Sequence, residues 1–316
     1  MTSVILNNFR QGFIGMSPLV KILLLVLLVA LFLLLSTILS FLLAIPIFHL
    51  SLGELYQILA DPQPDAVAVL KFFQVMQSVF LFVFPALLTA WLFSNNTTGY
   101  LNTNVKPSVL SFLLALSSLV VAIPLMNAIA QFNTGLSLPD RFESLERIIR
   151  EMEDSAEKLT GLFLHGETMG DLAVNLMMIA ILPALGEELL FRGVLQRLLT
   201  EWTRNSHAGV LIGAFVFSFI HFQFYGFIPR FLLGLYFGYL LLWSSSLWIP
   251  IAAHFMNNGF AVVYYHFSKA PMGETDMDQL GTGINGHTMV YISAFLTFML
   301  IGMIFIHEKN RKAALH

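Results

Sequence analysis

The sequence contains no cysteine among its 316 residues. Disulfide bonds and thiolate metal ligands are therefore excluded. A metal ion, if the protein holds one, would have to be bound by the nine histidines and the carboxylates. Zinc or another divalent metal therefore stays open at this point, as does a protein that needs no cofactor.

Charged residues are also scarce. They make up 11% of the chain, whereas 57% of the residues are hydrophobic. Soluble domains contain about a quarter charged residues, so this composition is typical of an integral membrane protein, whose partner is the lipid bilayer. Nothing in it indicates binding of nucleic acid.

Apolar runs of roughly 17–25 residues are long enough to cross a bilayer as helices. The sequence contains eight such runs, at residues 20–48, 66–93, 107–131, 169–196, 208–227, 229–245, 247–267 and 287–306. They predict an all-α fold, a polytopic membrane bundle of about eight transmembrane helices.

The basic residues predict the orientation of this bundle. With a cytoplasmic N-terminus and eight alternating spans, the inner segments contain nine basic residues and only two acidic ones. Both termini are then cytoplasmic. The short chain without a targeting extension is typical of a prokaryotic inner-membrane protein.

The loop at residues 132–168 lies outside the membrane in this topology. Its apolar residues alternate at spacings of three and four, which places them on one stripe of an amphipathic helix: Phe142, Leu145, Ile149, Met152, Ala156, Leu159 and Phe163. We expect this helix to lie across the outer mouth of the bundle. The chain then divides into residues 1–168, a core at 169–267, and residues 268–316, within one integrated membrane domain.

The stretch ALGEELLFRG, at residues 184–193, puts two adjacent carboxylates into the fourth span. Charges in hydrocarbon are costly unless they are paired or hydrated. Glu188 and Arg192 are four residues apart and share a helix face, so they can pair. Glu187 points elsewhere and is left free for chemistry. Pro183 lies one turn earlier and is expected to kink the helix and free a backbone carbonyl.

Three further polar residues interrupt later spans: His221 in the fifth, and His254 and Asn258 on one face of the seventh. Glu187 and His221 are equally far in sequence from Arg204, at the turn between their spans, so an antiparallel hairpin brings them to similar depth. We expect Glu187, His221, His254 and Asn258 to line one cavity open to the cytoplasm.

This set of side chains fits hydrolysis of an acyl bond. A carboxylate and an imidazole can activate water, while a second imidazole and a carboxamide can stabilise the oxyanion. Ser218 lies in no G-x-S-x-G motif, so a serine nucleophile is not indicated. Each polar residue alone is also consistent with interhelical packing. Lys71, Arg230 and Asp171 lie near span ends, where snorkelling is sufficient to explain them.

Three motifs in this order resemble a known family. EELLFR has two glutamates, three residues and an arginine; Phe217 and His221 form Phe-x-x-x-His; His254 and Asn258 form His-x-x-x-Asn. Over roughly residues 175–262 the chain is similar to the CAAX protease and bacteriocin-processing (Abi) family of intramembrane proteases. The first three spans carry no such motif.

The resemblance implies that Glu187 and His221 activate water and that His254 and Asn258 form the oxyanion site. Glu188 and Arg192 would hold Glu187 in place. Metal dependence stays open; if a metal is bound, its ligands would be Glu187, His221 and His254. The absence of cysteine and the presence of Asn258, a poor zinc ligand, favour a metal-free mechanism.

The expected activity is therefore that of an intramembrane endopeptidase acting on a peptide or a membrane-anchored protein. C-terminal CAAX-type processing of a lipidated substrate is one form of it. Two alternatives stay open: a non-catalytic scaffold or bacteriocin self-immunity protein, and a transporter with a proton relay. No inverted repeat supports the transporter.

Overall fold

The computed structural model describes residues 9–166, 168–269, 279–281, 283 and 286–314, and within these residues it contains helices and no strand. The all-α prediction is therefore confirmed. The first half of the chain forms α2 (Pro18–Phe48), α3 (Leu52–Ala60), η1 (Pro64–Ala66), α4 (Val67–Ser78), η2 (Val79–Val83), α5 (Phe84–Phe93), α6 (Thr97–Tyr100), α7 (Val109–Val121), α8 (Ile123–Thr134), η3 (Asp140–Phe142) and α9 (Glu143–Leu164).

The second half begins with one continuous helical rod that contains two π-helical segments. The rod consists of α10 (Met169–Asn175), η4 (Leu176–Ile181), α11 (Leu182–Glu187), η5 (Glu188–Leu195) and α12 (Gln196–Thr203). It ends at Arg204, whose left-handed backbone turns the chain back. Four helices follow: α13 (Ser206–Phe219), α14 (Phe227–Ser244), α15 (Trp248–Ser268) and α16 (Gly286–Ala313).

The eight expected spans correspond to these helices, with differences in detail. By length and composition, five of the described helices are able to cross a membrane, or six if α7 and α8 form one span. Those two helices meet at a bend of 50°, where Pro124 lies in the first turn of α8. The fifth expected span is shorter than predicted, because α13 stops at Phe219 and Phe222 adopts a positive φ that a helix cannot contain.

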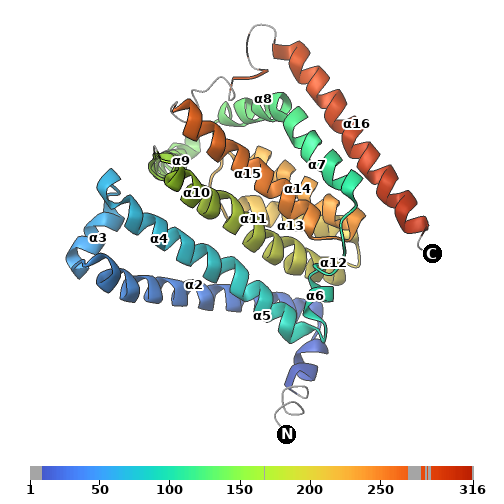
Figure 1. Cartoon of the computed structure of the whole chain (residues 1–316), viewed down its shortest axis with the longest axis horizontal. Helices are drawn as coiled ribbons and strands as arrows, with labels where there is room; N and C mark the ends of the chain where they lie inside the picture. Colours follow the sequence, from blue (N-terminus) through green and yellow to red (C-terminus); the bar gives the residue numbers. More distant parts are fainter. Residues whose placement is uncertain (1–8, 167, 270–278, 282, 284–285, 315–316) are drawn as a thin grey trace.

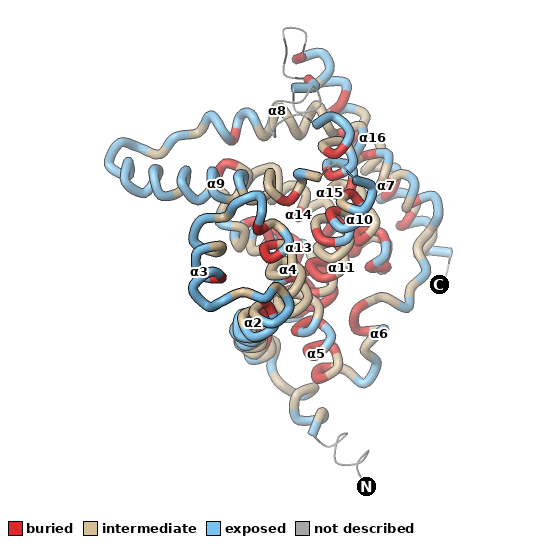
Figure 2. Tube along the Cα trace, turned by 60° about the vertical axis from the view of Figure 1, so that its left-hand side comes forward, coloured by how far each residue is buried: buried red, intermediate tan, exposed pale blue. Residues whose placement is uncertain are grey.

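The helices are arranged in three groups, as Figure 1 shows. The rod α10–α12, α13, α14 and α15 form the centre. A hairpin of α2 with α4 and α5 covers one side, and α7, α8 and α16 cover the other. Buried residues gather in the central helices, whereas α9 is largely exposed (Figure 2). The motif-bearing segments therefore occupy the interior.

Close approach of α13 and α14 depends on glycine. A Cβ at Gly234 would lie only 3.1 Å from Ala214 Cα, and one at Gly238 only 2.9 Å from Val210 Cγ1. The small-residue spacing at Gly234 and Gly238 therefore serves packing, as the sequence predicts. This contact brings the carbonyl of Gly234 within reach of the Arg192 side chain.

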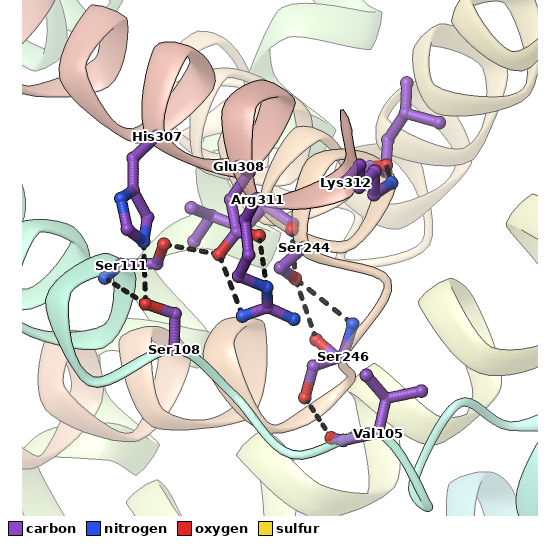
Figure 3. A network of polar contacts seen from close by, with 11 residues as sticks. Val105, Ser108, Ser111, Ser244, Ser246, His307, Glu308, Arg311 and Lys312 are labelled. Atoms are coloured by element: carbon purple, nitrogen blue, oxygen red, sulfur yellow. Dashed lines mark hydrogen bonds and ion pairs between the residues drawn. The ribbon is translucent and has the colours of Figure 1, made fainter. Parts of the chain in front are cut away.

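A buried polar network fixes the end of α16 against α7 (Figure 3). Glu308 is fully buried, accepts a hydrogen bond from Ser111 and pairs with Arg311 at 3.4 Å. His307 Nε2 lies 2.9 Å from the Ser108 hydroxyl. A buried carboxylate requires such partners, so this network determines where the last helix is docked.

Candidate active site

The rod, α13 and α15 place all four expected catalytic residues around one chamber. Glu187 ends α11, His221 follows α13, and His254 and Asn258 project from α15. The chamber has a volume of about 840 Å³, and all four residues line it. Cavities of this size are typical of ligand sites. The shared cavity expected from the spacing about Arg204 therefore exists in the fold.

Glu188 connects Arg192 with His254. It is fully buried, and its Oε1 accepts hydrogen bonds from Arg192 Nη1 and His254 Nδ1, both at 2.8 Å. The pairing with Arg192 was predicted from sequence and is confirmed. The resemblance also implies that Glu188 and Arg192 hold Glu187 in place. In the structure the second residue hydrogen-bonded to Glu188 is His254.

Arg192 is enclosed by aromatic rings as well as by Glu188. Its guanidinium carbon lies 4.3 Å from the ring centroid of Phe217 and 5.4 Å from that of Phe237. Phe237 also stacks on the His254 ring, with centroids 5.1 Å apart. Arginine over an aromatic face is stabilised by cation–π attraction. The ion pair and these rings together restrict His254 to one orientation.

Glu187 has a different environment from its neighbour. It is 8% exposed and lines the chamber. Its closest charged partner is His254, whose Nε2 lies 4.0 Å from Glu187 Oε2. That separation is too long for a direct hydrogen bond and suits a bridging water. Glu187 is therefore the carboxylate that is available for chemistry, as the sequence predicts.

His221 is held by the backbone of its own helix. Its Nδ1 lies 2.7 Å from the carbonyl oxygen of Phe217, an atom that can only accept. Nδ1 must therefore carry the proton, and in the neutral ring Nε2 keeps its lone pair. The Phe217 ring contacts both histidine rings, with centroid distances of 5.2 Å to His221 and 6.1 Å to His254.

Asn258 is oriented from two sides. Its Nδ2 donates to the carbonyl of Ile179 at 3.1 Å, and its Oδ1 accepts from Asn257 at 3.1 Å. Ile179 lies four residues before Pro183, which has no amide hydrogen to donate to that carbonyl. The carbonyl expected to be freed by Pro183 therefore anchors Asn258. The amide nitrogen of Asn258 retains one further hydrogen.

Residues 169–260 match a family model described as type II CAAX prenyl endopeptidase, Rce1-like. This region, which is less than half of the chain, is similar to that family and is called the Rce1-like region below. The family is one of membrane proteases, which confirms the resemblance drawn from the three motifs and the assignment to peptide-bond hydrolases. No curated protein and no solved structure matches the chain.

The three conditional metal ligands, Glu187, His221 and His254, line the same chamber. Across the described parts of the chain, no group of three or more histidine, cysteine, aspartate or glutamate side chains has an arrangement that could hold a metal ion. Metal dependence stays a prediction for experiment.

Helix α9 forms part of the wall of the chamber. Its second half contributes Ala156, Leu159 and Phe163 to the lining; its position across the outer mouth of the bundle stays a prediction. The turn after α13 fixes it: Tyr225 donates to Glu153 and Glu146, both at 3.0 Å. Arg150 lies over the Tyr225 ring, and its hydrogen bond is the main cause of the lowered pKa of the Glu146 carboxyl.

The contacts near the two chain ends do not involve the chamber. Arg10 donates to the carbonyl of Trp91 and Lys312 to that of Leu242, and none of these four residues lines the chamber. The cytoplasmic position of both termini and the opening of the cavity to the cytoplasm both stay predictions.

Arg230 is the functional candidate that sequence reasoning missed. Its place near a span end suggested snorkelling, but it is half-buried and lines the chamber. Its charge interacts with that of Glu187. A signal was present in YGFIPR, where a glycine precedes the arginine by one helical turn. Ser218 is engaged in packing instead, because its hydroxyl donates to the Phe227 carbonyl at 2.7 Å.

Proposed function

We propose that this protein is an intramembrane endopeptidase that uses a water molecule activated by Glu187 and His221. The observation that carries the proposal is the contrast between the two adjacent glutamates. Glu188 is hydrogen-bonded to Arg192 and His254. Glu187 instead faces the chamber, and its 4.0 Å distance from His254 suits a bridging water. A purely structural ion cluster has no need of the second carboxylate.

His221 suits the role of proton acceptor. Because Nδ1–H donates to the Phe217 carbonyl, the lone pair on Nε2 is available to a water in the chamber. Glu187 and His221 together withdraw the proton as the water oxygen attacks the scissile carbonyl. The same groups then return a proton to the departing amine, so that the peptide C–N bond breaks and a carboxylic acid and an amine are released.

His254 and Asn258 suit the stabilisation of the oxyanion. Nδ1 of His254 is hydrogen-bonded to Glu188, and its Nε2 faces Glu187 across 4.0 Å. When both ring nitrogens carry a proton, Nε2–H is available to the oxyanion. The remaining amide hydrogen of Asn258 is a second donor. Loss of one such donor typically costs about 10²–10³ in kcat.

The substrate class that fits is a peptide segment that reaches into the bundle from the membrane. The Rce1-like match supports CAAX-type processing at the level of the family, and a lipidated protein C-terminus is the form of substrate that we propose. The apolar side chains around the chamber, among them Leu81, Phe82 and Val262, suit apolar residues or a lipid chain.

The test is cleavage of a quenched-fluorescence peptide library by the purified protein, with Glu187→Gln and Ser218→Ala measured in parallel. We expect Glu187→Gln to lose at least about a hundredfold in rate and Ser218→Ala, whose hydroxyl bonds to backbone, to keep it. A lipidated peptide is added to the library as a second substrate form. Equal cleavage by wild type and Glu187→Gln would refute the role of Glu187 in the mechanism. No cleavage of either substrate form by wild type would instead favour a scaffold or immunity protein. Addition of a chelator to the same assay measures metal dependence directly.

A further inference from the structure

Among the described residues that line the chamber, Arg230 is the only lysine or arginine. Its Nη2 donates to Gln223 Oε1 at 2.6 Å. Its Nη1 is buried and has no hydrogen-bond partner within the described part of the chain. A buried guanidinium N–H without an acceptor lowers the stability of the fold, yet the chain has an arginine at this position.

The surroundings hold the guanidinium in one place. A Cβ at Gly226 would lie 3.1 Å from Arg230 Nη2 and 3.5 Å from Nη1, so the absence of a side chain at Gly226 makes the room that the guanidinium occupies. Gln223 fixes one edge of the planar fork. The other edge, at Nη1, has no acceptor among the described residues.

We propose that Arg230 binds the free C-terminal carboxylate of the peptide substrate. A carboxylate accepts two parallel hydrogen bonds from one guanidinium, a geometry that a lysine does not offer. It would supply the acceptor that Nη1 lacks. This inference rests on the proposed endopeptidase function and adds the residue that selects the substrate.

The position of Arg230 also limits where the substrate is cut. Arg230 lines the same chamber as Glu187, His221 and Asn258, and its charge interacts with that of Glu187. A substrate whose terminal carboxylate binds Arg230 therefore presents to Glu187 a peptide bond only a few residues from its C-terminus. The enzyme would release short C-terminal fragments and would not cut the middle of a long chain.

Binding is measured first, because it does not depend on catalysis. N-acetyl-trileucine and its C-terminal amide differ only in the charge that Arg230 would recognise. With purified protein in detergent, we expect the acid to bind at least tenfold more tightly than the amide to wild type and to Glu187→Gln. In Arg230→Met the ratio of the two affinities is expected to fall to about one. Equal binding of acid and amide by wild type overturns the proposal.

Two further variants separate recognition from folding. Lys71→Met removes another half-buried cation, one that bonds Asn175 and does not line the chamber, and it is expected to keep the acid preference. Gly226→Ala presses a methyl group onto the guanidinium and is expected to reduce the preference while keeping the charge. Loss of the preference in Lys71→Met would also overturn the proposal, since the effect would then be general.

Measuring cleavage as well as binding distinguishes the role of Arg230 from the proposed endopeptidase activity. If Glu187→Gln abolishes hydrolysis but wild type binds acid and amide alike, the endopeptidase stands and the role of Arg230 fails. If the acid preference depends on Arg230 but Glu187→Gln still cleaves, the carboxylate site stands and the proposed mechanism fails.

Discussion

Replacing Glu188 by glutamine is expected to destabilise the protein far more than the same change at Glu187. Glu188 is fully buried and accepts two hydrogen bonds at 2.8 Å, from Arg192 and His254. Glutamine keeps the shape but removes the charge, so Arg192, which is 2% exposed, loses its direct ion-pair partner. Breaking a buried pair in this way costs about 3–5 kcal/mol.

Glu187→Gln has no such consequence. The Glu187 carboxylate makes no hydrogen bond to another described residue at the site, and its nearest ionic contact is 4.0 Å long. Neutralising a carboxylate that is buried without a close partner relieves a desolvation cost. The expected change in the free energy of unfolding is therefore close to zero or slightly stabilising, although activity is lost.

The assay is unfolding by SDS in mixed detergent micelles, followed by tryptophan fluorescence. The double variant Glu188→Gln with Arg192→Met serves as the control, because it removes both charges of the ion pair at once. It is expected to recover part of the stability that Glu188→Gln loses. A cost below about 1 kcal/mol for Glu188→Gln, or equal costs at the two glutamates, would refute the assignment of one residue to structure and the other to chemistry.

Two further predictions concern the ends of the bundle. Single cysteines at Ser155 on α9 and at Glu201 on α12, both exposed, are expected to react oppositely with a membrane-impermeant maleimide on intact cells. The basic-residue distribution predicts labelling at Ser155 only; labelling at Glu201 only would invert the orientation, and labelling at both would contradict a spanning bundle. Glu308→Gln weakens the bonds to Ser111 and Arg311 and is expected to cost about 1–3 kcal/mol in the SDS assay. Cleavage is expected to persist, since this network lies away from the chamber; loss of cleavage at unchanged stability would contradict that separation.

Several features of the site followed from local sequence alone. Helical geometry puts Glu188 and Arg192 on one face, and the structure has them 2.8 Å apart. Pro183 has no amide hydrogen, so local sequence predicts a backbone carbonyl free to accept elsewhere; the identity of its donor, Asn258, comes from the tertiary structure. The apolar stripe of residues 142–163 predicts a helix, which α9 confirms. Each of these depends on neighbours within a few residues.

The fold class likewise follows from sequence, because a long apolar run without charges can satisfy its backbone in a membrane only as a helix. The limits of the helices were less predictable. The bend between α7 and α8 and the early end of α13 at Phe219 depend on proline and on a single positive φ. Such local changes interrupt a helix without making the run of residues any less apolar, so the length of an apolar run does not reveal them.

By itself, then, the sequence determined the membrane bundle, the Glu188–Arg192 pair and the identity of the polar residues that gather in its core. Only the tertiary structure decided that Glu188 also holds His254, that Tyr225 fixes α9, and that Arg230 lines the chamber. The physical reason is that these contacts join helices distant in sequence. Their relative rotation and depth depend on packing, such as the approach of α13 and α14 at Gly234, which no single helix specifies.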